Sequence, residues 1–63
     1  MRLSREKIDL QRAERCMTVS ELAKRYGVSR ARMNVILNQK EFSPVSVGRM
    51  AKALNCNVTD ILE

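Results

Sequence analysis

The polar side chains best suited to base recognition are concentrated in residues 30–38. An arginine that reaches the floor of a DNA groove can donate two hydrogen bonds to guanine O6 and N7, and an asparagine can pair with adenine N6 and N7. Apolar side chains beside them can contact a thymine methyl group. We therefore expect base contacts from Arg30, Ala31, Asn34 and Val35.

The competing interpretation is an ordinary solvated helix surface, on which single exposed apolar residues are common. Arg30 and Arg32 count against it, because positive charge at a helix N-terminus opposes the macrodipole by roughly 0.3–1 kcal/mol. Something other than local stability favours two arginines there. Asn34 stays nearly balanced between the two interpretations.

Catalytic and metal chemistry are disfavoured by the composition. The 63 residues include no His, so the usual general base near neutral pH is absent, and the seven acidic residues are scattered singly. We expect no enzyme, no cofactor, no metal and no small-molecule ligand. Cys16 and Cys56 do not form a C-x-x-C pair, and neither a secretory signal nor a membrane-spanning run is present. Reduced, partly buried thiols in a cytoplasmic protein are therefore expected.

The charge balance favours a polyanionic partner. Twelve Lys and Arg against seven Asp and Glu give a formal charge of +5, which suits DNA, RNA or an anionic membrane face. Solubility alone is the alternative, so the positions of the charges must decide. Tyr26 and Phe42 are the only aromatic residues and are expected in packing, which disfavours a base-stacking single-strand binder.

The hydrophobic pattern predicts an all-α fold in one domain, with five helical segments and no strand. Thr18 and Glu21 form a capping-box pattern, and Ser43–Pro44 is a standard helix opening. The inner face of the first helix is assigned to Leu3, Leu10, Ala13 and Met17, with Ile8 off this arc. The expected segments cover residues 4–16, 19–26, 29–38, 44–54 and 57–62.

The second and third segments meet at Gly27-Val28-Ser29, which leaves no room for a longer loop. Helices joined so tightly must cross steeply, as in a helix-turn-helix whose second helix projects into a major groove. Ala23 permits close approach, and Gly27 tolerates the positive φ of the turn. Residues expected to hold this unit to the core are Leu22, Val28, Met33 and Leu37.

The motif ELAKRYGVSRARMNVIL, followed by N-x-K-x(3)-P and GRMAKALN-x-x-VTDIL, resembles the lambda-repressor-like, Cro-type helix-turn-helix family. The resemblance covers about Ile8 to Leu62. It implies a compact five-helix DNA-binding domain of a bacterial, phage or mobile-element regulator. Two positions depart from the family pattern: Val19 replaces a phosphate-binding Gln, and Gln39 replaces a Gly, so Gln39 or Asn38 is expected to bear the strain of that turn.

Phosphate contacts position a protein on DNA without recognising sequence. Arg12 matches a family arginine that lies near the DNA backbone or pairs with an acid. Lys24 and Arg25 are as easily solvated as bound to DNA, and Arg49 and Lys52 are assigned to solvent. The expected phosphate contacts are Arg12, Thr18, Ser29, Arg32, Asn38, Lys40 and Ser43.

The sequence therefore predicts double-stranded DNA binding by a small, repressor-like transcriptional regulator, with residues 29–38 in the major groove. A homodimer is expected because one small module buries little DNA surface, and the candidate dimer surface is Ile61 and Leu62 with Ile8. These side chains could equally belong to the core. Two alternatives remain: a protein-interaction module such as an antitoxin or anti-repressor, and an excisionase-like protein that bends DNA.

Overall fold

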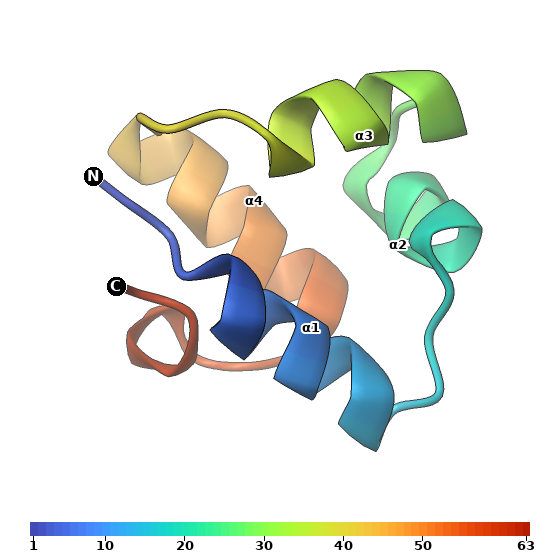
Figure 1. Cartoon of the computed structure of the whole chain (residues 1–63), viewed down its shortest axis with the longest axis horizontal. Coiled ribbons are helices and arrows are strands. Elements are labelled where there is room, and N and C mark those ends of the chain that lie inside the picture. The colour runs from blue at the N-terminus through green and yellow to red at the C-terminus, as the bar shows by residue number, and fades with distance from the viewer.

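Four α-helices and one short 3₁₀ turn make up the chain in the computed structural model, which describes residues 1–63 (Figure 1). The all-α prediction is confirmed, although the fifth element is a single 3₁₀ turn rather than a full helix. No helix has the length and hydrophobicity needed to span a bilayer. The elements are α1 (Arg5–Glu14), α2 (Val19–Tyr26), α3 (Arg30–Leu37), α4 (Pro44–Leu54) and η1 (Val58–Asp60).

Each α-helix begins at a hydroxyl residue whose side chain accepts a hydrogen bond from the backbone N–H three residues later. At α2 the Thr18 hydroxyl accepts from the Glu21 N–H at 3.1 Å, and a Glu21 carboxylate oxygen accepts from the Thr18 N–H at 3.3 Å. The predicted capping box is confirmed, as is Pro44 in the first turn of α4. These caps satisfy donors that a helix leaves unpaired.

Three helices end in the same way, at a residue in the left-handed region. The N–H of the following residue then donates to a carbonyl five residues back, which is the Schellman arrangement. Gly27, at φ 93°, ends α2 as predicted, whereas two of these positions are not glycine. The left-handed residues are Cys16 (φ 50°), Gly27 (φ 93°) and Asn55 (φ 56°).

Helix α3 ends differently, and the strain expected at Asn38 or Gln39 is absent. Asn38 has φ −92° and ψ −2°, and Gln39 is not among the positive-φ residues. The Asn38 N–H bonds the carbonyls of Asn34 and Val35, so the helix closes in the right-handed region. The expectation was wrong because this turn never requires a positive φ.

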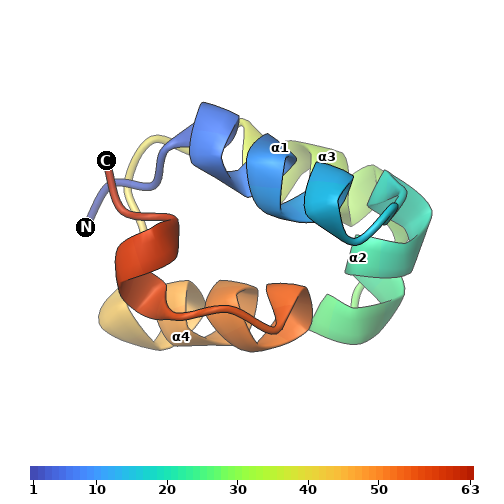
Figure 2. The ribbon, with the colours of Figure 1, turned by 90° about the horizontal axis from the view of Figure 1, so that it is seen from below.

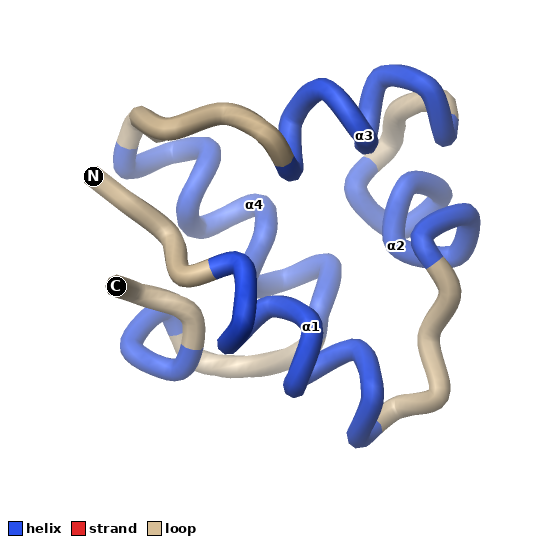
Figure 3. Tube along the Cα trace, viewed as in Figure 1, coloured by secondary structure: helices blue, strands red, loops and turns tan.

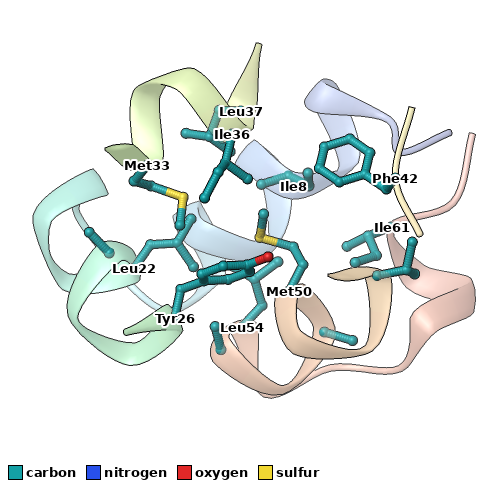
Figure 4. Close-up of a cluster of buried hydrophobic side chains, with 14 of the residues drawn as sticks. Ile8, Leu22, Tyr26, Met33, Ile36, Leu37, Phe42, Met50, Leu54 and Ile61 are labelled. Carbon is teal, nitrogen blue, oxygen red and sulfur yellow. The ribbon is translucent and has the colours of Figure 1, made fainter. Parts of the chain in front are cut away.

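The core consists of 15 buried residues, all of them hydrophobic. Figure 4 shows Leu22 and Met33 of the helix-turn-helix directed toward Met50 and Leu54 of α4. Met33 and Met50 are fully buried and Met17 nearly so, which confirms the inward positions predicted for Met17 and Met33. Tyr26 and Phe42 are also buried, as expected.

The inner face of α1 was predicted wrongly. Ile8 is only 2% exposed and belongs to the core, whereas Leu10 is 54% exposed. The predicted arc included Leu3 and Met17, which lie outside α1 on either side of it. Because these two residues are not helical, including them in the helical pattern assigned the wrong side of α1 to the core.

The two ends of the chain lie side by side, as Figures 1 and 3 show. The Ser4 N–H donates to the Ile61 carbonyl at 2.9 Å, and Leu3 forms an isolated antiparallel bridge with Leu62. The N-terminal segment is bonded on its other side as well, because the Met1 carbonyl accepts a hydrogen bond from the Phe42 N–H at 2.8 Å. This segment therefore joins the loop after α3 to the C-terminal residues.

The dimer surface predicted at Ile61, Leu62 and Ile8 is not available for contact with another molecule. Ile61 is fully buried, Ile8 is almost so, and Leu62 is partly buried against the same core. The expectation failed because the bridge between the chain ends folds η1 back onto α4 and encloses these side chains.

Candidate nucleic-acid interface

Helix α3 presents the predicted base-contacting residues to solvent. Met33, Ile36 and Leu37 are buried beneath it. The outward residues are all exposed, and Val35 is 54% exposed even though it is a large apolar side chain. Those outward residues are Arg30, Ala31, Arg32, Asn34, Val35 and Asn38.

The outward residues divide into a centre and two flanks. Successive side chains on an α-helix are separated by about 100°, so Ala31 and Val35 lie opposite the buried stripe. Arg30 and Asn34 fall on one flank of this apolar centre, and Arg32 falls on the other. A groove that admits α3 would thus meet a small apolar strip bordered by one amide and two guanidinium groups.

The turn between α2 and α3 is as tight as the sequence predicted, since α2 ends at Tyr26 and α3 begins at Arg30. Ala23 is 2% exposed, which allows the helices to approach closely, and Val28 is partly buried against the core. Ser29 caps α3 by accepting from the Arg32 N–H at 3.1 Å. Helix α2 packs on both α3 and α4. The contact between α2 and α4 therefore fixes the orientation of α3 relative to the rest of the domain.

Arg49 of α4 reinforces that contact, although the sequence assigned it to solvent. Its Nη2 donates to the Tyr26 carbonyl at 2.8 Å, and its Cζ lies 4.4 Å from the centre of the Tyr26 ring. The guanidinium therefore holds the last carbonyl of α2, next to Gly27. No local pattern signals this contact, because 23 residues separate the partners.

The positive charge is concentrated in residues 22–40, from the first turn of α2 to the loop after α3. Residues 22–40 contain five basic and no acidic residues, while the rest of the chain contains seven of each. The whole formal charge of +5 thus belongs to this segment. None of its basic side chains forms an ion pair or a hydrogen bond within the protein. The five residues are Lys24, Arg25, Arg30, Arg32 and Lys40.

The predicted phosphate contacts differ in how free their side chains are. Asn38 and Lys40 are exposed, with no side-chain partner. The hydroxyls of Ser29 and Ser43 cap α3 and α4 but are solvent-accessible. The Thr18 hydroxyl is hydrogen-bonded to both the backbone and the side chain of Glu21.

Arg12 is bound mainly to the protein itself. Its Nη1 donates to the Met17 carbonyl and its Nη2 to an Asp9 carboxylate oxygen, both at 3.0 Å. Its buried Nε has no hydrogen-bond partner. Arg5 also bonds Asp9, at 3.2 Å. Burial alone would raise the pKa of Asp9, but the hydrogen bonds and charges of Arg12 and Arg5 outweigh it and lower the pKa below its ordinary value.

The two cysteines are free thiols in different settings. Cys16 is exposed, so the expectation of two partly buried thiols is wrong for this residue, whose left-handed position at the end of α1 faces solvent. Cys56 is partly buried. Burial raises the pKa of the Cys56 thiol, Asp60 adds to the rise, and Arg15 opposes it.

The comparison with protein families agrees with this geometry. Residues 7–63 match the Cro/C1-type HTH DNA-binding domain. No curated protein and no solved structure gives a significant match. Since the matched region covers nearly the whole chain, the chain belongs to the Cro/C1-type helix-turn-helix family, and it is a DNA-binding domain.

Proposed function

We propose that this domain is a sequence-specific transcriptional regulator that acts as a repressor by occupying an operator. The observation that carries the proposal is the concentration of unpaired positive charge on residues 22–40, a segment that includes the whole exposed face of α3. Neutralising phosphates there would release counterions and favour binding. An operator occupied in this way excludes polymerase without any cofactor.

Within this proposal α3 lies in the major groove, and its residues have separate roles. Arg30 and Asn34, on the same flank, bond base edges, while Ala31 and Val35 meet thymine methyl groups. Arg32, on the opposite flank, contacts a backbone phosphate at the edge of the groove. The remaining phosphate contacts come from Arg12, Thr18, Ser29, Asn38, Lys40 and Ser43.

The repressor acts as a homodimer on DNA. A single module of this kind buries only about 600–1,000 Å², which is too little for tight specific binding. Two copies on adjacent half-sites would double the contacts. The dimer surface must use residues other than Ile8 and Ile61, because those side chains are enclosed in the core.

The test is selection from a pool of randomised duplexes, followed by sequencing of the bound DNA. The expected product is an inverted repeat with half-site centres about one helical turn apart. Enrichment of a single half-site would contradict the dimer, and no enrichment over the input would contradict sequence-specific regulation. Several adjacent copies of a site that bends on binding would instead indicate an excisionase-like architectural role.

A further inference from the structure

A second basic surface lies at the junction of α2 and α4, away from the outward face of α3. It is an open groove of about 380 Å³, lined by Arg25, Tyr26, Arg49, Lys52 and Ala53. Three of the five lining residues are cationic and none is acidic. We refer to it as the α2–α4 groove.

The groove is partly preorganised. Arg49 is held by the Tyr26 carbonyl at 2.8 Å and lies over the Tyr26 ring at 4.4 Å. A guanidinium has five N–H donors, so most of them remain free after this one bond. A cation fixed in this way loses little side-chain entropy when it binds an anion.

The other two cations of the groove are unpaired. Arg25 and Lys52 are exposed and form no ion pair or side-chain hydrogen bond. Glu21, one turn before Arg25, is bonded at the Thr18 cap instead. The groove therefore carries three positive charges without any compensating acid along its walls.

The duplex bound by α3 does not account for this charge. Figure 2 shows α4 along one edge of the molecule and α1 and α3 along the opposite edge, with α2 between them. Two of the three cations of the groove, Arg49 and Lys52, belong to α4, so DNA seated on the outward face of α3 would leave these two charges open.

The shape of the groove disfavours a small free anion. Small-molecule sites enclose most of the ligand surface, typically about 70–90%, whereas this groove is open on one side. A macromolecular partner can supply the missing wall from its own surface. Guanidinium groups bind carboxylates in a bidentate manner, and Arg and Tyr are enriched at the energetic centres of protein interfaces.

We propose that the α2–α4 groove docks an acidic segment of a partner protein, with carboxylate side chains bound by Arg25, Arg49 and Lys52. Tyr26 and Ala53 form the apolar floor between these charges. The regulator would then hold DNA on α3 while this separate surface contacts the partner.

The test is titration of the ¹⁵N-labelled chain with a Glu/Asp-rich peptide at low salt. Amide shifts are expected at the end of α2 and in the second half of α4, with little change in α3. Lys52→Glu should weaken binding by about fivefold or more, because it places like charges in the groove, and Lys52→Gln should give a smaller loss. Arg2→Glu is the matched control, since Arg2 is exposed and makes no side-chain contact.

The proposal would be overturned by four outcomes. The first is the absence of peptide binding, and the second is an equal loss in Lys52→Glu and Arg2→Glu. The third is competition by inorganic phosphate at the concentration of the peptide itself, which would indicate a small-anion site. The fourth is a loss of duplex affinity in Lys52→Glu but not in Arg2→Glu, which would assign the groove to nucleic acid.

Discussion

Single side chains of α3 decide whether the interface recognises sequence or only charge. Arg30 is exposed, unpaired and placed at the helix N-terminus, where its charge opposes the helix dipole. A residue kept at a locally unfavourable position is a strong candidate for function. Arg32 shares the position but lies on the other flank of α3, so the two arginines should behave differently when replaced.

Arg30→Ala is expected to lower affinity for the selected duplex by about 1–3 kcal/mol, roughly 5–150-fold, because a bidentate contact to a base is lost. Fluorescence anisotropy with the selected and a scrambled duplex measures this difference. Arg32→Ala should weaken both duplexes alike. If Arg30→Ala also weakens both equally, Arg30 contacts phosphate rather than a base.

Asp9 links stability to pH through its two arginine partners. Its pKa in the folded chain lies below the ordinary value of 3.8, so the unfolded chain binds more protons in acid. The resulting stabilisation is complete above the ordinary pKa and is lost as the pH falls through the folded pKa. Thermal melts in this acidic window should therefore show a falling melting temperature.

Asp9→Asn should reduce the fall in melting temperature at acidic pH, because the asparagine side chain does not titrate. The same dependence of melting temperature on pH in Asp9→Asn and the parent chain would show that other carboxyl groups account for it. Glu6→Gln is a suitable control, since Glu6 is an exposed acid of α1 that forms no ion pair.

At the scale of the helices, α1, α2 and α4 end at left-handed residues, and of these only Gly27 is the residue type that such positions favour most. A side chain in this region costs about 1–2 kcal/mol, although Asn tolerates it better than most. Cys16 therefore stores more strain at the end of α1 than Asn55 does at the end of α4. At both positions, as at Gly27, the N–H of the following residue donates to the carbonyl five residues back.

Cys16→Gly is expected to raise the free energy of unfolding by roughly 0.5–1 kcal/mol, after the added freedom of glycine in the unfolded chain is subtracted. Asn55→Gly should give a smaller gain. Gly27→Ala should lower stability by about 1 kcal/mol through its φ alone, since a Cβ there would meet Arg49 only at an ordinary 3.7 Å. Urea denaturation measures all three. Destabilisation by Cys16→Gly would show that the thiol contributes more than its backbone strain costs.

At the scale of the whole molecule, the charge is polarised. Residues 22–40 carry the entire excess of five positive charges, because the rest of the chain contains seven basic and seven acidic residues. A molecule charged in this way should approach a polyanion with α2 and α3 foremost. The orientation is thus favoured before any base is contacted.

Affinity for non-specific duplex should fall with salt, with a slope of about −3 to −4 per protomer in a plot of log K against log salt, if each of the four unpaired cations of residues 22–40 that lie outside the α2–α4 groove neutralises one phosphate. Lys40→Ala should reduce the slope by about 1, whereas Arg2→Ala should leave it unchanged. Filter binding or anisotropy over a salt series gives the values. A flat response would contradict an electrostatic interface on α3.

The positions of the helix ends and turns in this chain follow from residues that are close together in the sequence. The Thr18–Glu21 box, the Ser43–Pro44 helix opening and the left-handed Gly27 were all predicted correctly, because their bonds join residues within one or two turns. The outward face of α3 was also predictable, since one helical period separates Met33, Ile36 and Leu37 from Ala31 and Val35. The contacts of these residues with DNA stay predictions.

Tertiary packing decided the rest. Whether Ile8 or Leu10 faces the core depends on how α1 packs against α4. The burial of Ile61 depends on the bridge between the two ends of the chain. The Arg49–Tyr26 contact and the α2–α4 groove join segments 23 or more residues apart. Such contacts form only when distant segments meet in the folded core, so no periodicity or spacing along the chain encodes them.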